Sequence, residues 1–398
     1  MTEPVSVLVV GLGGYGEVYL EPLLSEEGAE RCRIVGAVDP EPARCVHLGE
    51  LEARGIPIVS SMEEFYETGR AELAVISSPI QHHSEHVCLA LERGSHVLVE
   101  KPAAAVTRDV DRMIRARDAA ERFVAVGFQW CFSPSVLRLK EDILSGRFGE
   151  PRWGRSLTLW PRTESYYGRN DWAGRRQDRE GRWILDSPAN NAMAHHLHNL
   201  LFLLGPTMDR CAGPSAISAM TARVNEIETF DTVAARVFLQ GGAELLFLGS
   251  HTIAEEEAAD PRFMVEFEEV TLIYPGGTAP MSVRRKEDVI AEYPAPDTAP
   301  QVTKLWYSVQ AVRTGGPIPC GLETARPQVA CIEAIDQAGS EPHWFSDEVL
   351  RASETSAGRL RWVEGLAGAL LSSYRTGERL VWPGGGTAGL WAGFGEGL

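Results

Sequence analysis

The sequence predicts a two-domain protein of the α/β class, with a doubly wound parallel sheet in residues 1–131 and a mostly antiparallel sheet in residues 132–398. Apolar strand-like runs alternate with helix-compatible segments over the first 131 residues. A glycine-rich turn joins the first strand to the first helix. Beyond residue 205, strand-like segments follow one another with glycine turns between them. The 398 residues are ample for two such domains.

The first strand, Val5–Val10, leads into a loop that matches the G-x-G-x-x-G dinucleotide pattern. Gly11 would allow a tight turn, Gly13 the close approach of a pyrophosphate, and Gly16 the close packing of the next helix. The alternative is an incidental glycine turn. The residues predicted to bind a dinucleotide here are Gly11, Gly13, Gly14, Tyr15 and Gly16.

Asp39 ends the second strand, Arg33–Val38, at about the distance from the glycines expected for a ribose carboxylate. A carboxylate there accepts hydrogen bonds from a free 2′-hydroxyl and repels a 2′-phosphate. NAD is therefore favoured over NADP, although Arg44 nearby weakens the preference and leaves NADP as an option.

The rest of the first domain continues the alternation. The expected strands are Ile56–Ser60, Leu73–Ser77, His96–Val99 and Phe123–Phe128, and the expected helices are Glu17–Glu27, Ser61–Thr68, Ser84–Arg93 and Thr107–Glu121.

Two loops that follow these strands are predicted to border the cofactor, because ligands bind at the carboxyl ends of strands in such sheets. Ser78, Pro79 and His83 belong to the first loop, and Glu100 and Lys101 to the second. A lysine directly after a buried strand is well placed to present an ammonium in a cleft. The alternative for Lys101 is a solvated loop lysine.

A helix is predicted over about residues 187–204, capped by Ser187 and ended by Gly205. Asn191, His195 and His198 fall on one stripe of this helix, which we predict faces a nicotinamide and its substrate. A metal site is the alternative for the histidines, but no acid or cysteine completes a familiar ligand spacing, so no metal is predicted.

The loop between residues 160 and 182 is rich in arginine and aromatic residues. From Arg152 to Arg182 the local charge is +4, in a chain whose formal charge is −17. Arginine binds carboxylates and phosphates, and aromatic rings stack on sugars, so a substrate wall is predicted. A subunit interface is the alternative. The candidate substrate residues are Arg162, Tyr166, Tyr167 and Trp172.

The remainder of the second domain reads as strands followed by helices. His251 lies on one of the strands and is expected to be a hydrogen-bonded core or interface histidine rather than a ligand. The expected strands are Trp153–Trp160, Ala216–Val224, Thr229–Leu239, Ala243–Thr252, Phe263–Phe267 and Val270–Tyr274, and the expected helices are Ser133–Ser145, Gln301–Arg313, Glu323–Ala338 and Glu354–Tyr374.

Bulk properties exclude several classes of partner. The acidic charge argues against nucleic-acid and anionic-membrane binding, and no apolar run is long enough to span a membrane. The seven cysteines show no C-x-x-C pair, and the first residues contain no basic signal segment. We therefore expect a cytoplasmic enzyme with reduced thiols.

The glycine loop, Asp39, the Ser78–His83 loop, Glu100-Lys101-Pro102 and a histidine ten residues before Gly205 together resemble the Gfo/Idh/MocA oxidoreductases, which include inositol and glucose–fructose enzymes. The resemblance covers the first 130 residues closely and residues 152–205 well. It implies a Rossmann domain, then an α/β domain with a large, open, mostly antiparallel sheet. It also implies a bound nicotinamide and hydride transfer at a sugar or polyol carbon.

The resemblance places the family's catalytic lysine on Lys101 and its histidine on His195. Asn191 and His198 stand where the family commonly has aspartates. Asparagine can hold a substrate hydroxyl but cannot take its proton, so Asp186 is predicted to supply a carboxylate from a shifted position. We expect Lys101 and His195 to converge beside the nicotinamide, while Asn191 and His198 orient the substrate.

The expected substrate is small and polyhydroxylated, with an anionic group as one option. We also expect a homodimer or homotetramer formed through the C-terminal sheet. Two rival functions stay open: an NAD-dependent glycoside hydrolase that oxidises its substrate transiently, and a non-catalytic NAD-binding sensor.

Overall fold

The structure, a computed structural model, describes residues 3–384 and 392–395. The chain forms two compact units. The first comprises Met1–Ser133 and Ala299–Arg326, and the second comprises Pro134–Thr298 and Pro327–Leu398. The predicted division at residue 131 was therefore wrong for Ala299–Arg326. This segment belongs to the first unit because its helix α10 (Thr303–Thr314) packs on the parallel sheet and inserts a buried lysine there.

The first unit contains a six-stranded parallel sheet in the order β3-β2-β1-β4-β5-β6, which is the Rossmann order. The predicted fold class is confirmed. The strands are β1 (Val5–Val10), β2 (Cys32–Val38), β3 (Ile58–Val59), β4 (Leu73–Ile76), β5 (His96–Val99) and β6 (Val124–Val126). The helices before α10 are α1 (Gly16–Leu24), α2 (Glu26–Arg31), α3 (Leu48–Ala53), α4 (Met62–Thr68), α5 (His83–Glu92) and α6 (Thr107–Ala120).

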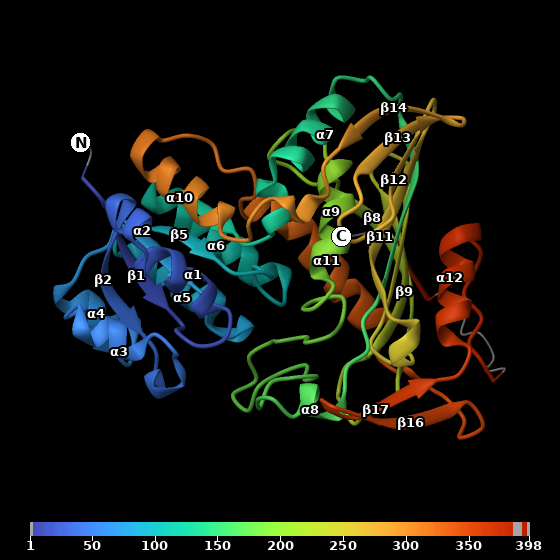
Figure 1. The fold of residues 1–398 in the computed structure, drawn as a ribbon, viewed down its shortest axis with the longest axis horizontal. Helices are drawn as coiled ribbons and strands as arrows, with labels where there is room; N and C mark the ends of the chain where they lie inside the picture. The colour runs from blue at the N-terminus through green and yellow to red at the C-terminus, as the bar shows by residue number, and fades with distance from the viewer. Residues whose placement is uncertain (1–2, 385–391, 396–398) are drawn as a thin grey trace. The chain divides into compact units, whose positions relative to one another are not determined.

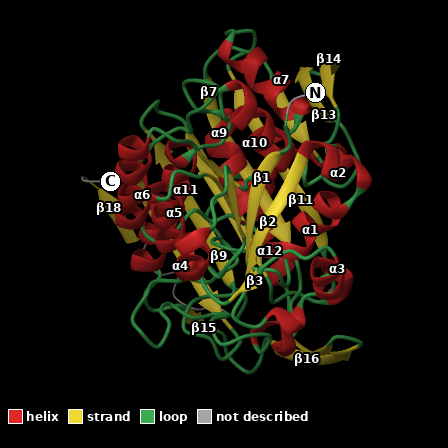
Figure 2. Ribbon diagram, turned by 90° about the vertical axis from the view of Figure 1, so that its left-hand side faces the viewer, coloured by secondary structure: helices red, strands yellow, loops and turns green. Residues whose placement is uncertain are grey.

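The chain reverses direction across this sheet after β3, so right-handed crossovers place the helices on both faces. Figure 2 shows α1, α2 and α3 on one side of β1 and β2, and α4, α5 and α6 on the other. The central strands are apolar and fully buried between these layers. The carboxyl ends of β1, β2, β4 and β5 carry the loops that were predicted to bind a cofactor.

The second unit is built on a ten-stranded mixed sheet, in the order β14-β13-β12-β11-β7-β10-β9-β8-β15, with β18 paired to β8. Its helices are α7 (Pro134–Leu144), α8 (Glu164–Tyr167), α9 (Ala194–Leu203), α11 (Leu322–Ala338, which starts in the first unit) and α12 (Leu366–Thr376). Its strands are β7 (Pro151–Leu159), β8 (Pro214–Arg223), β9 (Thr232–Leu239), β10 (Glu244–Ser250), β11 (Ala259–Phe267), β12 (Thr271–Tyr274), β13 (Met281–Arg285), β14 (Asp288–Tyr293), β15 (His343–Trp344) and β18 (Ala392–Gly395).

Most neighbours in this sheet are antiparallel, as predicted, but β10 pairs parallel with β7, and β15 pairs parallel with β8. Strands β13 and β14 and the short strands β15 and β18 were also not predicted from the sequence. The helix predicted over Glu354–Tyr374 was wrong in its first half, because β16 (Leu350–Thr355) and β17 (Gly358–Val363) form an antiparallel hairpin there. The backbone pairing from Leu350 with Val363 to Thr355 with Gly358 overrides the helical reading, and Gly365, at φ 80°, separates the hairpin from α12.

The sheet of the second unit is covered on both faces. Helices α9 and α7 lie on one face and α12 on the other (Figure 1). A core of β7, β8, β9 and β10 side chains packs against α12 through Leu366, Leu370 and Tyr374. The sheet face that was expected to pair with a second subunit is therefore covered by the chain's own helix over these strands.

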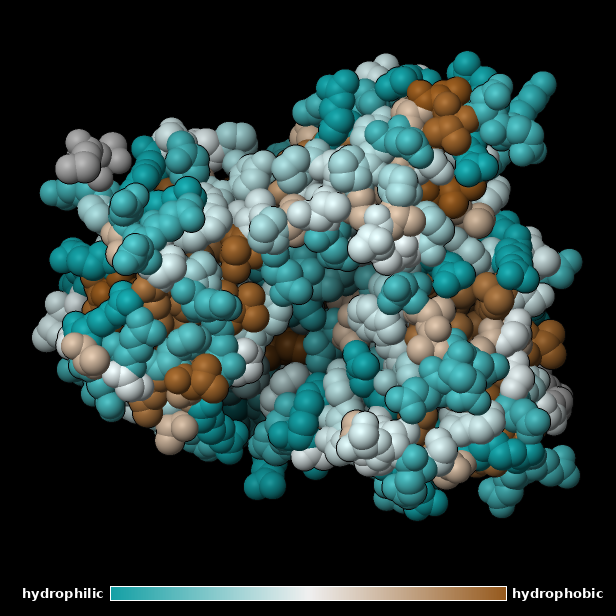
Figure 3. Space-filling model, viewed as in Figure 1, coloured by the Kyte–Doolittle hydropathy of each residue, from teal (hydrophilic) through white to brown (hydrophobic). Residues whose placement is uncertain are grey.

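The hairpin β16–β17 forms a separate two-stranded sheet. Most of the β16 side chains are exposed, and Figure 3 shows a mostly hydrophilic surface where the hairpin lies. Among the described residues, no helix combines the length and apolar character that a membrane span requires.

Candidate functional site

The glycine loop that follows β1 has the geometry predicted for each of its pattern glycines. Gly11 has φ 82°, and a Cβ there would lie 2.8 Å from the carbonyl carbon of Ser77. A Cβ on Gly16 would lie 2.0 Å from the Gly11 oxygen, so the start of α1 can approach the strand only with glycine. A Cβ on Gly13 would meet only the Cβ of Arg44, at 3.9 Å. The backbone at Gly13 is therefore open, which fits close approach of a pyrophosphate.

Asp39 lies directly after β2, at the ribose position of this fold. Its two carboxylate oxygens accept the backbone N–H groups of Leu12 and Glu41, both at 2.8 Å. These bonds hold the carboxylate beside the glycine loop. Arg44, which was expected to weaken the preference for NAD, forms an exposed ion pair with Glu41 at 2.7 Å.

The loop after β4 is tied to the loop after β5 by His83, which is only 1% exposed. Its Nε2 contacts the carbonyl oxygen of Ser78 and its Nδ1 that of Pro102, both at 2.8 Å. Burial lowers the pKa of this imidazole. His83 was predicted to contact the cofactor, but both ring nitrogens are used within the protein, so it joins two loops instead. The Ser78 hydroxyl contacts Nδ1 of His86 at 2.9 Å.

The loop after β5 carries Glu100 and Lys101. Glu100 is 6% exposed, and its Oε2 accepts the backbone N–H of Lys101 at 3.1 Å. Its Oε1 accepts from the ammonium of Lys304 at 2.5 Å and from the Tyr19 hydroxyl. Glu100 is therefore fully engaged inside the first unit, whereas Lys101 is only half-buried. Sequence reasoning missed Lys304, because nothing local marks it as the partner of a residue 204 positions earlier.

The helix predicted over residues 187–204 is shorter in the structure, because α9 begins at Ala194 with Met193 as its N-cap residue. Residues 187–193 form turns in which Ser187 accepts from the backbone N–H of Asn190, and Met193 donates to the Pro188 carbonyl. The side chains of Asn190 and Asn191 compete with helical hydrogen bonding in this segment. His195, on the first turn of α9, is half-buried.

Asp186, which was predicted to supply a carboxylate from a shifted position, is hydrogen-bonded to Asn191. The Asn191 amide donates to one oxygen of Asp186 at 2.8 Å, and the backbone N–H of Gly174 donates to the other at 2.6 Å. Asp186 is 2% exposed. His198, also buried, has its Nε2 3.7 Å from the Cys211 sulfur, and its ring stacks on Phe202 at 6.3 Å.

The four predicted substrate residues of the arginine-rich loop form one cluster with Arg169 and His251. The Tyr166 ring lies between the guanidinium carbons of Arg162, at 5.2 Å, and Arg169, at 3.7 Å. Arg169 also covers the Trp172 ring at 5.2 Å, and its Nη2 is 3.9 Å from Asp186. Arg169 was not singled out, although the local arginine count contained it.

Tyr167 and His251 form the buried side of this cluster. The Tyr167 hydroxyl lies 2.9 Å from Nδ1 of His251. Burial, with Arg162 and Arg169 nearby, holds the pKa of His251 well below its usual value, and burial raises the pKa of Tyr167. Both groups are therefore uncharged at neutral pH. The expectation of a hydrogen-bonded core histidine at position 251 is confirmed.

Two buried polar atoms of this cluster have no hydrogen-bond partner within the described part of the chain. They are Nε of Arg162 and Nε2 of His251. The two residues are neighbours, because the Arg162 backbone N–H donates to the His251 carbonyl at 3.0 Å. An unsatisfied buried polar atom calls for an explanation, such as a catalytic role or an ordered water or ion.

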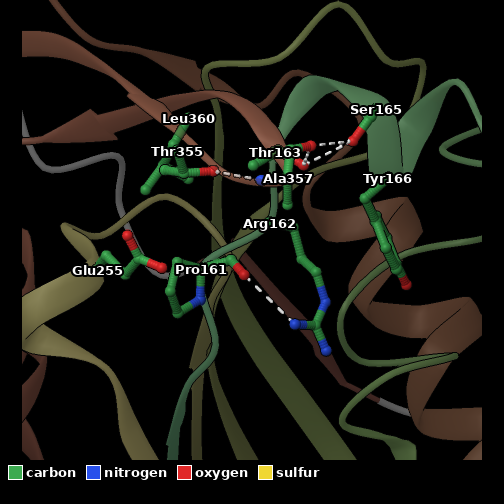
Figure 4. A pocket seen from close by; sticks show the side chains of 9 residues that line it. All are labelled: Pro161, Arg162, Thr163, Ser165, Tyr166, Glu255, Thr355, Ala357 and Leu360. Atoms are coloured by element: carbon green, nitrogen blue, oxygen red, sulfur yellow. Dashed lines mark hydrogen bonds between the residues drawn. The ribbon is translucent and has the colours of Figure 1, made fainter.

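A pocket of about 500 Å³ opens beside this cluster, within the size range of small-molecule sites. In Figure 4 the side chains of Arg162 and Tyr166 extend side by side, and Glu255 lies on the other side of Pro161. The hydroxyls of Thr163 and Ser165 bond to the Ala357 carbonyl at 3.2 and 2.7 Å, so they attach α8 to the hairpin.

Most other arginines of this loop are used structurally, which the sequence count did not reveal. Arg176 pairs with Asp336 at 2.9 Å, and Arg182 pairs with Asp178 at 2.6 Å. Arg155 donates to the Tyr374 and Arg375 carbonyls. The local charge of the loop therefore overstates what is available to a ligand, and Arg162 is the strongest remaining candidate.

The sheet order, the glycine geometry and Asp39 define the first unit as a dinucleotide-binding Rossmann domain. Residues 5–128 match the family model described as "oxidoreductase family, NAD-binding Rossmann fold". This match over residues 5–128 agrees with the sequence resemblance to the Gfo/Idh/MocA oxidoreductases.

Two curated relatives match part of the chain. A 1-carboxy-3-chloro-3,4-dihydroxycyclohexa-1,5-diene dehydrogenase from Comamonas testosteroni is 31% identical over 150 residues, which are 37% of this chain and 37% of that protein. An inositol 2-dehydrogenase from Rubrobacter xylanophilus is 30% identical over 166 residues, 40% of this chain and 46% of that protein. The matches span less than half the length of these relatives.

The fold is also found in solved structures. The WlbA dehydrogenase from Bordetella pertussis, in complex with NADH and UDP-GlcNAcA, has a TM-score of 0.70 and 21% identity. The similarity covers 86% of this chain and all of that chain. At this level of identity, the likeness shows the fold alone.

Proposed function

We propose that the protein is an NAD-dependent oxidoreductase that interconverts a hydroxyl and a carbonyl on a sugar, sugar acid or polyol. The observation that carries this proposal is the loop from Gly11 to Gly16, where two glycines are required by packing and Gly13 is open. Bound NAD would accept or supply the hydride. The curated relatives support the substrate class, because their names describe dehydrogenases of a cyclic polyol and of a carboxylated cyclic diol.

In this proposal the first unit holds the cofactor. The backbone at Gly13 and the start of α1 bind the pyrophosphate, and Asp39 accepts the hydroxyls of the adenosine ribose. Gly14, Tyr15, Ser78 and Pro79 shape the surrounding loops. Asp39 would repel a 2′-phosphate, which supports NAD over NADP, and Arg44 forms an exposed ion pair with Glu41.

Lys101 and His195 supply the proton chemistry in this proposal. Lys101 donates a hydrogen bond to the reacting oxygen, and His195 takes or returns its proton, because imidazole titrates near neutral pH. Asn191 cannot move a proton. Its amide donates to Asp186, and this pair would orient a substrate hydroxyl, together with His198.

We propose that the substrate carries an anionic group, which binds at Arg162. Arg162 lines the pocket, and a guanidinium is matched best by a carboxylate or phosphate. The Tyr166 ring provides a stacking surface for a sugar ring, and Glu255, on the rim of the pocket, can accept hydroxyls. This combination favours a sugar acid over a neutral cyclitol.

The test is NADH formation at 340 nm with a panel of sugar acids, neutral sugars and cyclitols. Lys101→Met should lower turnover by about a hundredfold or more while NADH still binds. Lys286→Met, at an exposed lysine of the second unit, is the matched control. Cleavage of an aryl glycoside without net NADH would instead indicate the hydrolase. Unchanged turnover in the Lys101 and His195 variants would remove both residues from the mechanism.

The oligomeric state and the cytoplasmic location remain predictions. Light scattering of the purified protein measures the first, and cell fractionation measures the second. A dimer formed through β11–β14 would be compatible with α12, which covers β7 and β10.

A further inference from the structure

The first unit contains a buried ammonium that the proposed mechanism does not use. The side chain of Lys304, on α10, has no exposed surface. Its Nζ donates to Glu100 Oε1 at 2.5 Å, to the Tyr15 hydroxyl at 3.0 Å and to the Gly127 carbonyl at 3.2 Å. All three N–H bonds are therefore used. Burial lowers the pKa of this ammonium, while Glu100 acts in the opposite direction.

The acceptor that matters most is Glu100, because its other oxygen holds the backbone of Lys101 at 3.1 Å. The carboxylate also packs directly on Gly127, where a Cβ would lie only 2.7 Å from Oε1 and 2.8 Å from Oε2. Glu100 can thus adopt few other orientations while Lys304 is in place. The direction in which the chain leaves β5 at Lys101 depends on this ion pair.

The second acceptor belongs to the glycine loop. Tyr15 is the N-cap residue of α1, and its hydroxyl donates to Gln301 at 3.1 Å while it accepts from Lys304. Its ring centre lies 4.5 Å from the Lys304 nitrogen, within cation–π range. One ammonium therefore contacts both the loop proposed to bind pyrophosphate and the residue that precedes Lys101.

An ion pair this deeply buried is weak evidence for a role in stability alone. Replacing both members of a buried pair by neutral groups is often neutral or stabilising, whereas removing one member leaves an uncompensated charge and is strongly destabilising. What the charged pair supplies, and an apolar pair cannot, is fixed direction: the ammonium donates three hydrogen bonds and the carboxylate accepts three.

We infer that Lys304 is a positioning residue for the proposed dehydrogenase, which acts through Glu100 and Tyr15 to hold the Lys101 loop and the glycine loop in the geometry that binds the dinucleotide. This inference rests on the proposed function. It assigns a role in the cofactor domain to a residue that lies beyond most of the second unit in the sequence.

The experiment separates positioning from stability with three variants: Lys304→Met, Glu100→Gln and the double variant. Lys140→Met is the matched control, since Lys140 is equally buried but lies in the second unit, where it donates to the Arg210 carbonyl at 2.8 Å. Three quantities are measured: the urea midpoint, the NADH dissociation constant, and the rate of Lys101 acetylation by an N-hydroxysuccinimide ester, mapped by mass spectrometry.

Lys304→Met should lower the urea midpoint, and the double variant should recover most of it because no charge is left buried without a partner. The double variant should nevertheless bind NADH about tenfold or more weakly and acetylate Lys101 about threefold or more faster, since its loops are no longer held. Lys140→Met should change neither the NADH affinity nor the acetylation rate.

A double variant with the NADH affinity and acetylation rate of the natural protein would overturn the inference and leave the pair a structural one. If Lys304→Met does not fold, Glu100→Gln and the double variant still decide the matter. Failure of the natural protein to bind NADH would count against the proposed function. The acetylation rates would then still test whether Lys304 positions Lys101.

Discussion

Asp231 offers a test of how burial governs the charge state of the second unit. It precedes β9 and has no exposed surface. One carboxylate oxygen accepts the backbone N–H groups of Val224 and Asn225 at 2.9 Å and the Asn225 amide at 3.0 Å. The other oxygen has no partner within the described ranges of the chain. Burial outweighs these bonds and raises the pKa of Asp231 from 3.8 to about 6.

The sign of the effect follows from proton binding. Between the two pKa values the folded state holds more protons than the unfolded state, so this group's contribution to stability falls as the pH rises through that window. The contribution of Asp231 to stability is full below the pKa of its carboxyl group in the unfolded state and is lost above the pKa in the folded state. A shift of about two units at about 1.4 kcal/mol per unit corresponds to about 3 kcal/mol.

Asp231→Asn is the informative change, because the amide oxygen can accept the same three hydrogen bonds and does not titrate. The free energy of unfolding of this variant, relative to the natural protein, should rise by on the order of 1–3 kcal/mol from pH 4 to pH 7. Urea unfolding followed by tryptophan fluorescence at several pH values measures it. Asp288→Asn, at an exposed aspartate, is the control and should show a flat difference.

A flat or falling difference for Asp231→Asn would refute the reasoning. It would mean that the bonds from Val224 and Asn225 outweigh burial and keep the carboxylate ionised. The result also bears on the substrate cluster, since the Asp231 carbonyl accepts the His251 backbone N–H at 2.9 Å.

Two further predictions concern the cofactor loop and the pocket. Gly13→Ala should retain the urea midpoint, because its Cβ meets only one side-chain atom, but should weaken NADH binding by about tenfold or more. Gly16→Ala should instead lower the urea midpoint, because its Cβ contacts the Gly11 oxygen. Fluorescence titration and urea unfolding distinguish the two variants, and an unchanged NADH affinity in Gly13→Ala would exclude close approach of the cofactor there. Ala357→Trp narrows the pocket and should raise KM by about tenfold with little change in kcat. The control is Ser356→Trp, at an adjacent exposed residue that does not line the pocket, and it should leave KM and kcat unchanged. Equal KM values in the two variants would show that the substrate does not use the pocket.

The first unit was largely predictable because its signals are local. The apolar run His96–Val99 is confirmed as β5, and the predicted helix from Thr107 begins at that residue. Alternation of strand and helix, together with the handedness of crossovers, then determines the order of the sheet. The glycine geometry follows as well, since only glycine can occupy positions such as Gly11 and Gly16.

The second unit was predicted less well, because its pairings are not between consecutive segments. The parallel neighbours β7 and β10 are separated by α9, β8 and β9 along the chain. The stretch Glu354–Tyr374 contains enough helix formers to mask a hairpin whose turn ends at Gly358. The site shows the same limit: the aromatic residues were identified, but the pairing of neighbouring arginines with acids was not.

The placement of Lys304 has a consequence for how the two units fold. The first unit is completed only by Ala299–Arg326, which the chain reaches after most of the second unit. Without that segment Glu100 lacks the ammonium of Lys304 and keeps only the hydrogen bonds from the Lys101 backbone and the Tyr19 hydroxyl. The first 133 residues therefore contain the strands, the glycine loop and Asp39, but not the charge that balances Glu100. If Lys304 positions the two loops as inferred above, the dinucleotide-binding geometry depends on Ala299–Arg326 as well as on the N-terminal third.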